Sequence, residues 1–124
     1  MRFALCAVAC LAVACASEDE GKTDPRVERM QAELTQLRDA LRERPGTPLL
    51  EFQIGQVFDQ YGLVDSARAA YERSIELYDA FPEAHLQLAQ IYYEDGLLAQ
   101  SVRSYEQVVL FDPANAPAHN NLGY

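Results

Sequence analysis

The sequence predicts an all-α chain that folds as a short solenoid of paired helices, and two observations lead to this fold class. When the chain is shifted by 34 residues, matching residue types superpose, for example Gly62 on Gly96 and Tyr71 on Tyr105. A fixed period of this length is the signature of a repeat solenoid. Within each period the apolar residues recur every three or four positions, as they do along one face of an amphipathic helix.

Residues 1–14 have the composition of a signal peptide. A positive start at Arg2 is followed by an apolar run from Phe3 to Ala14, which is too short to span a bilayer. Residues 11–15 (Leu-Ala-Val-Ala-Cys) resemble a bacterial lipobox, and this resemblance implies a lipid on Cys15 as the first residue of the mature chain. We therefore expect a protein of the bacterial cell envelope that is attached to a membrane only through its lipid and faces the periplasm or the outer surface.

Two alternatives stay open for this segment. Ordinary signal peptidase cleavage after the small residues 14–16 would yield a soluble periplasmic or secreted protein, and an uncleaved segment would remain as an anchor. All three cysteines lie at or before Cys15, so the mature chain has no disulfide framework. Residues 15–24 comprise the lipidated cysteine and a polar, acidic stretch with the composition of a flexible tether.

Residues 25–47 are expected to form an N-terminal capping helix. Their apolar residues, from Val27 to Leu41, are spaced by three and four positions. Carried forward by the 34-residue period, Leu37 and Leu41 coincide with Tyr71 and Ile75, which identifies this helix as the second half of a degenerate repeat. A dimerising coiled coil and a loosely attached helix are the alternatives, because the same spacing fits a short heptad seam.

Residues 48–81 and 82–115 each predict two helices joined at a glycine. Gly62 and Gly96 can adopt the positive φ that ends one helix before the next begins. With the period, the motif residues of these units resemble the tetratricopeptide repeat (TPR), although Glu51 and Asp79 depart from its pattern. They are Ile54-Gly55, Phe58, Gly62, Ala67 and Tyr71 in the first unit, and Leu88-Ala89, Tyr92, Gly96, Ser101, Tyr105 and Pro113 in the second.

The resemblance implies a short right-handed α-solenoid of helix-turn-helix repeats. TPR 1 would cover residues 48–81, TPR 2 residues 82–115, and the start of a truncated TPR 3 residues 116–124. Terminal repeats ordinarily end in a polar helix, which the sequence does not provide after residue 116. We expect a truncated product of a longer reading frame or, as the alternative, an edge that pairs with another chain.

The composition argues against several classes of function. Ten Lys and Arg against nineteen Asp and Glu, a net charge of −9, leave no basic surface for nucleic acid. No phosphate loop or nucleophile motif occurs, and Glu94-Asp95 have no partner base in register, so we expect neither an enzyme nor a cofactor. His85 and His119 are equivalent residues of adjacent units, too few and too far apart for a metal site, and we expect both to pack within the fold.

By the family resemblance, the first helix of each repeat lines a concave face that binds peptides or partner proteins. The face lacks Lys and Arg, and residues 45–124 carry eleven acidic and three basic side chains. We therefore expect a protein or peptide partner that is basic or neutral; the alternative is that the charge serves only solubility. The expected partner-binding residues are Phe52, Gln56, Asp59, Leu86, Gln90, Tyr93 and Asn120.

Together these features predict a non-catalytic protein–protein interaction scaffold, a membrane-tethered repeat lipoprotein. Two alternatives remain at this stage. The first is a component of an envelope or type IV pilus assembly machine. The second is an N-terminal fragment of a larger repeat-containing enzyme or secretion protein.

Overall fold

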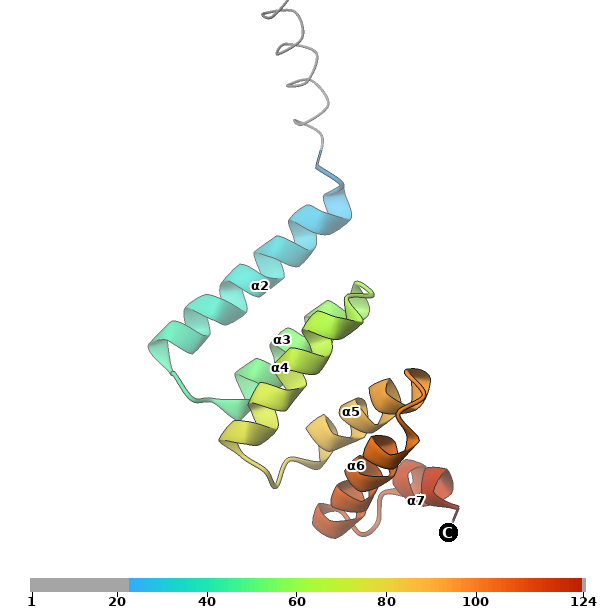
Figure 1. Ribbon diagram of the computed structural model, residues 1–124. Helices are drawn as coiled ribbons and strands as arrows, with labels where there is room; N and C mark the ends of the chain where they lie inside the picture. Colours follow the sequence, from blue (N-terminus) through green and yellow to red (C-terminus); the bar gives the residue numbers. More distant parts are fainter. Residues whose placement is uncertain (1–22, 124) are drawn as a thin grey trace, which may run out of the picture.

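The computed structural model describes residues 23–123, which form six α-helices stacked in chain order (Figure 1). No β-strand occurs within this range, so the predicted all-α fold is confirmed. The predicted signal peptide of residues 1–14, the lipidation site Cys15, and Tyr124 lie outside the described residues. Between residues 23 and 123, no helix has the length and apolar character needed to cross a membrane. The helices are α2 (Pro25–Glu43), α3 (Pro48–Gln60), α4 (Val64–Leu77), α5 (Pro82–Glu94), α6 (Leu98–Phe111) and α7 (Ala116–Leu122).

Two helix-turn-helix units, α3 with α4 and α5 with α6, form the middle of the stack. Each turn contains a glycine with positive φ, 77° at Gly62 and 76° at Gly96. In the first turn the Gly62 amide donates to the Asp59 carbonyl and the Leu63 amide to the Phe58 carbonyl, which is the hydrogen-bond pattern of a Schellman cap. Residues with a side chain are strained at this φ, which explains why glycine occupies both turns. The prediction that Gly62 and Gly96 separate the paired helices is confirmed.

Small residues let the paired helices approach closely. Gly55 of α3 faces the ring of Tyr71 on α4, and a Cβ added at Gly55 would lie only 2.5 Å from Tyr71 Cε1. Ala67 and Ala70 are fully buried on α4. The Tyr71 side chain, only 1% exposed, fills the space beside these small residues. The predicted packing of small against large residues thus sets the spacing of α3 and α4.

One hydrophobic cluster joins the two units. Leu88 and Ile91 of α5 pack there against Ala67 and Tyr71 of α4, together with residues of α3. Burying apolar side chains of three helices in one cluster stabilises the order of the stack, since none of these helices can cover its apolar face alone.

Helix α2 packs on the other side of α3. Leu34, which is buried, contacts a cluster that includes Ile54 and Val57 of α3. At the 34-residue equivalents of the buried Ala67 and Ala70, α2 carries Glu33 and Gln36. Both side chains line a groove between α2 and α3, so α2 carries polar residues at positions that are apolar in α4.

Candidate partner-binding face

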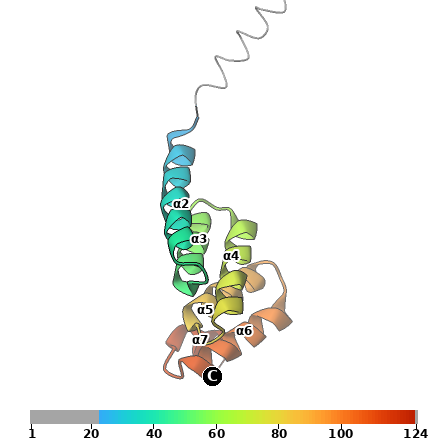
Figure 2. The same ribbon diagram turned by 90° about the vertical axis from the view of Figure 1, so that its left-hand side faces the viewer.

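The first helices of the repeats, α3, α5 and α7, lie on one side of the stack, and α4 and α6 lie on the other (Figure 2). Five of the seven predicted partner-binding residues have exposed side chains on these first helices. Tyr93 is the most prominent of the large ones, with 64% of its surface exposed. These residues are Gln56 and Asp59 on α3, Gln90 and Tyr93 on α5, and Asn120 on α7.

The other two predicted residues, Phe52 and Leu86, occupy equivalent places and turn inward. Phe52 is 8% exposed, and its ring centroid lies 5.4 Å from that of Tyr71 and 5.0 Å from that of Phe81. Leu86 is half-buried and packs beside Ala89 and other residues of a third cluster. Both side chains therefore contribute to the core, which leaves the five exposed residues as the accessible part of the predicted face.

A row of glutamine side chains adjoins this face, and Gln56 is the one of them that was predicted to bind a partner. A groove of about 410 Å³ runs between α2 and α3. Four glutamines line it, and none of their amides has a hydrogen-bond partner among residues 23–123. Each free amide offers one group that donates and one that accepts. The glutamines are Gln36 of α2 and Gln53, Gln56 and Gln60 of α3.

A sequence signal for this row exists. Gln53, Gln56 and Gln60 are three and four residues apart, so they share one face of a helix. The 34-residue equivalents of Gln53 are Gln87 and Asn121, so an amide recurs in all three first helices. Gln53 and Gln87 are half-buried, and Asn121, which is exposed, donates to the Tyr105 hydroxyl at 3.0 Å.

The first helices also differ from the others in charge. Neither Lys nor Arg occurs in α3, α5 or α7, while α2, α4 and α6 all carry arginine. Asp59, Glu83 and Glu94 are exposed and have no ion pair within the described part of the chain. The remaining acid, Glu51, is 9% exposed and its Oε2 lies 3.1 Å from Nε of Arg73. The face of the first helices is therefore acidic and rich in amides.

The two histidines close the linkers between repeats. Nε2 of His85 donates to the Asp79 carbonyl at 2.8 Å, and Nε2 of His119 donates to the Pro113 carbonyl at 2.6 Å. The His85 ring is 5% exposed and stacks on Phe111, with centroids 5.9 Å apart. Within residues 23–123 no group of three His, Cys, Asp or Glu residues is arranged to hold a metal ion. Both histidines thus take structural roles at equivalent positions.

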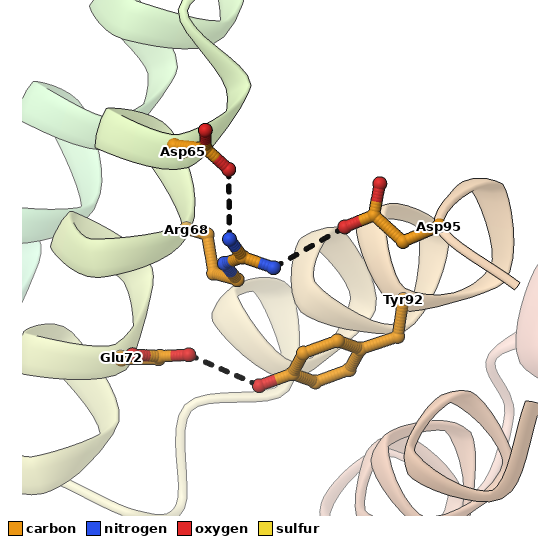
Figure 3. A network of polar contacts seen from close by, with 5 residues as sticks. All are labelled: Asp65, Arg68, Glu72, Tyr92 and Asp95. Atoms are coloured by element: carbon orange, nitrogen blue, oxygen red, sulfur yellow. Dashed lines mark hydrogen bonds and ion pairs between the residues drawn. The ribbon is translucent and has the colours of Figure 1, made fainter. Parts of the chain in front are cut away.

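Polar contacts also join the two repeats, and one of them is made by Tyr92, whose ring packs against the apolar cluster (Figure 3). Arg68 of α4 contacts Asp65 on its own helix at 2.7 Å and Asp95, at the end of α5, at 3.2 Å. The Tyr92 hydroxyl donates to Glu72 Oε1 at 3.1 Å. Asp95, half of the acid pair noted in the sequence, therefore has a cationic partner in the preceding repeat and helps to set the angle between repeats.

Comparisons with known proteins agree with this geometry. Residues 82–115 match the family model described as tetratricopeptide repeat. Over 77 residues the chain is 30% identical to uncharacterized protein ycf37 of Cyanophora paradoxa, an alignment that covers 56% of this chain and 45% of that relative. The chain thus spans less than half the length of the curated relative that it matches.

Two solved structures share the fold. The first TPR of Spaghetti (RPAP3), bound to the HSP90 peptide SRMEEVD, matches with a TM-score of 0.69 at 16% identity, over 77% of this chain and 76% of that one. TTC0263, a thermophilic TPR protein of Thermus thermophilus, matches with a TM-score of 0.67 at 24% identity, over 84% of this chain and 54% of that one. The described helices therefore have the fold of tetratricopeptide repeats, and residues 82–115 form one such repeat by sequence as well.

Proposed function

We propose that this chain is a non-catalytic interaction module that binds a basic or neutral segment of a partner protein along the face of α3, α5 and α7. The observation that carries the proposal is the composition of these three helices: α3 and α5 contain acids and amides, α7 contains amides, and none of the three contains Lys or Arg. Exposed amides can pair with both the N–H and the C=O groups of a peptide backbone. Unpaired carboxylates attract a cationic segment, most strongly at low salt.

The structural relative that binds a peptide offers a useful contrast. The HSP90 peptide bound by Spaghetti, SRMEEVD, contains three acidic residues and one arginine. An acidic peptide of this kind would meet Asp59, Glu83 and Glu94 on the present chain without a compensating cation on the same helices. Like-charge repulsion therefore predicts that the chain rejects this peptide and prefers one of opposite charge.

A charge-matched pair of peptides tests the proposal. SRMEEVD and a version with its three acidic residues replaced by lysine are titrated into the full chain at low and at physiological salt. We expect binding of the lysine peptide only, with an affinity that falls as salt rises. Substituting Gln56→Ala, Gln90→Ala and Tyr93→Ala together should weaken this binding at least about tenfold. The matched control, Gln100→Ala with Gln107→Ala on α6, should leave it unchanged. Equal binding of both peptides, or of the two variants, would contradict the proposal.

We further propose that the chain is held at a membrane of the bacterial cell envelope through a lipid on Cys15. The supporting observation is the lipobox-like sequence of residues 11–15. A lipid anchor adds membrane affinity in proportion to its buried methylene groups. Cys15→Ser should therefore move the protein from the membrane fraction to the soluble fraction of the envelope. Persistence of this variant in the membrane fraction would exclude the anchor.

A further inference from the structure

A groove runs between α2 and α4, with residues of α3 as its floor. It consists of two adjoining parts, of about 300 Å³ and about 330 Å³, which share Leu41, Glu51 and Arg73. All of its lining residues lie between residues 38 and 77, so neither end of the described range borders it. None of them is among the predicted partner-binding residues, so this groove is a different surface from the face of α3, α5 and α7.

The equivalent place one repeat further along, among α4, α5 and α6, is closed by side chains of this chain. The Tyr92 hydroxyl donates to Glu72 Oε1 at 3.1 Å, which connects α5 to α4 (Figure 3). His85 of α5 stacks on Phe111 of α6, with ring centroids 5.9 Å apart. One carboxylate and one pair of rings therefore connect the three helices there.

The groove between α2 and α4 has different residues at these four positions. Phenylalanine has no hydroxyl to donate, arginine is not an acceptor, and neither glutamate nor leucine has a ring to stack. The equivalents of Tyr92, Glu72, His85 and Phe111 are Phe58, Arg38, Glu51 and Leu77, in that order. Within residues 23–123, the groove between α2 and α4 therefore lacks both of the contacts that close the equivalent place.

Each wall of the groove presents an arginine with free hydrogen-bond donors. Arg38 of α2 is exposed and has neither a hydrogen bond nor an ion pair among residues 23–123. Arg73 of α4 donates from Nε to Glu51 Oε2 at 3.1 Å, and its side chain is still 48% exposed. Its two terminal nitrogens have no partner in the described part of the chain. The remaining charged residue, Glu76, lines the part of the groove that contains Leu77 and not the part that contains Arg38.

We propose that this groove binds an extended, acidic segment of a partner protein. The segment places a carboxylate between Arg38 and Arg73 and an aromatic ring against Leu77, which is 47% exposed. A carboxylate and aromatic rings are also the groups that close the equivalent place one repeat further along. Charge complementarity selects the acid, because Glu51 is already paired while both walls offer guanidinium donors.

The spacing and the local charge fit such a segment. Side chains on the same side of an extended chain are about 6–7 Å apart, close to the one-turn spacing of Arg38 and Leu41 along α2. The chain as a whole has a net charge of −9, but residues 25–44 carry five arginines and four acidic residues. The acidic excess therefore lies elsewhere. The inference goes beyond the proposed function, which concerns a basic or neutral segment on the face of α3, α5 and α7.

The probe is a short peptide in which two glutamates and then one phenylalanine alternate with serine, so the three side chains share one side of an extended chain. Its binding to the full chain is followed by fluorescence anisotropy. One control peptide has glutamine for glutamate and another has serine for phenylalanine. We expect both controls to bind at least about tenfold more weakly, and the affinity of the probe to fall as salt rises. SRMEEVD, which has no aromatic residue, should again not bind.

Two substitutions in the groove and two matched controls locate the site. Arg38→Gln should weaken binding severalfold and reduce its salt dependence. Arg38→Gln together with Leu77→Gln should weaken binding at least about tenfold. Both side chains are already exposed, so the fold should be retained. Arg42→Gln on α2 and Leu110→Gln on α6 change exposed residues of the same types outside the groove, and binding should be unchanged in both.

Each remaining outcome would overturn the inference. It fails if the probe does not bind, if the glutamine peptide binds as tightly, or if Arg42→Gln weakens binding as much as Arg38→Gln. It fails if neutral amides at residues 18–20 (Glu-Asp-Glu) raise the affinity severalfold, because the occupant is then the chain's own acidic segment. It also fails if ultracentrifugation finds a dimer that Arg38→Gln abolishes, because the occupant is then a second copy. The proposed function fails separately, since Gln56→Ala with Gln90→Ala should leave the binding of this probe unchanged.

Discussion

The junction between α4 and α5 and the junction between α6 and α7 are built from equivalent sequence positions but differ in how they are covered. At the first, Leu88 is 1% exposed within a cluster that draws residues from three helices. At the second, its equivalent Leu122 is half-buried at the margin of a smaller cluster. Arg68 with its two carboxylates stands at the first junction, whereas Val102 stands exposed at the second. Among residues 23–123, the same repeat pattern thus yields a closely packed junction between α4 and α5 and a more exposed one between α6 and α7.

The largest expected difference between the junctions concerns these two leucines. Leu88→Ala removes a fully packed side chain and leaves a cavity, so it should lower the free energy of unfolding by about 2–5 kcal/mol. Leu122→Ala loses only part of that burial and should cost less than about 1.5 kcal/mol. Urea unfolding followed by circular dichroism measures both. Equal losses would mean that the α6–α7 junction is as well packed as the α4–α5 junction.

A second difference lies within the repeats, at Gly55 and its equivalent Ala89. Gly55→Ala would place a methyl group against the Tyr71 ring, since the Cβ would lie 2.5 Å from Cε1. Overpacking of this kind should lower the free energy of unfolding by about 1–3 kcal/mol. The second repeat already carries alanine at this position.

A rescue variant separates the steric cause from a general loss of packing. Tyr71→Leu in the Gly55→Ala background removes the ring that the new methyl group meets. The double variant should therefore lose less stability than the sum of the two single variants, which urea unfolding of all three would show. Strictly additive losses would argue against a direct clash between these residues.

These examples show which features the sequence analysis could predict. The helix pairs, the glycine turns and the small-against-large packing follow from local patterns that repeat, so one chain supplies its own comparison. The inward placement of the Phe52 side chain could not be predicted from the spacing of residues along α3. Its position lies between the open face of α3 and the rings of Tyr71 and Phe81, and only the assembled stack decides which way the side chain turns. The Arg68–Asp95 pair and the Tyr92–Glu72 bond connect residues 27 and 20 positions apart. Such contacts depend on the angle between repeats, which is a property of the assembled stack. Most of the glutamine row could have been predicted, because Gln53, Gln56 and Gln60 are spaced by three and four residues and so share one face of a helix.

The two equivalent tyrosines, Tyr71 and Tyr105, differ in how their hydroxyl groups are satisfied. The Tyr71 hydroxyl is buried with no hydrogen-bond partner among the described residues, while that of Tyr105 accepts from Asn121 at 3.0 Å. Tyr71→Phe should therefore leave stability unchanged or raise it by up to about 1 kcal/mol, because an unsatisfied polar atom is removed. Tyr105→Phe should instead cost about 0.5–1 kcal/mol. Thermal and urea unfolding of both variants would test the contrast.

The same hydroxyl predicts how stability depends on alkaline pH. Burial, and then the Asp59 carboxylate, raises the pKa of Tyr71 from 10.0 to about 12. The folded chain therefore keeps this proton where the unfolded chain loses it, so the stability it contributes is present below pH 10 and is lost progressively between about pH 10 and 12. Tyr71→Phe should flatten this part of the profile. An unchanged slope in urea unfolding across that pH range would contradict the assignment.

The smallest expected effect comes from the ion pairs of the α4–α5 junction, which have no counterpart between α6 and α7 within residues 23–123. Arg68 is 29% exposed and pairs with the more exposed Asp65 and Asp95, so solvent and salt screen much of the attraction. Arg68→Gln should lower the free energy of unfolding by less than about 1 kcal/mol at low salt, and by less still at high salt. The matched control is Arg103→Gln on α6, because Arg103 is exposed and has no ion pair within residues 23–123. That control should change stability at neither salt concentration. If the two variants behave alike, the pairs drawn in Figure 3 orient the repeats without stabilising them, and the difference between the junctions rests on apolar packing alone.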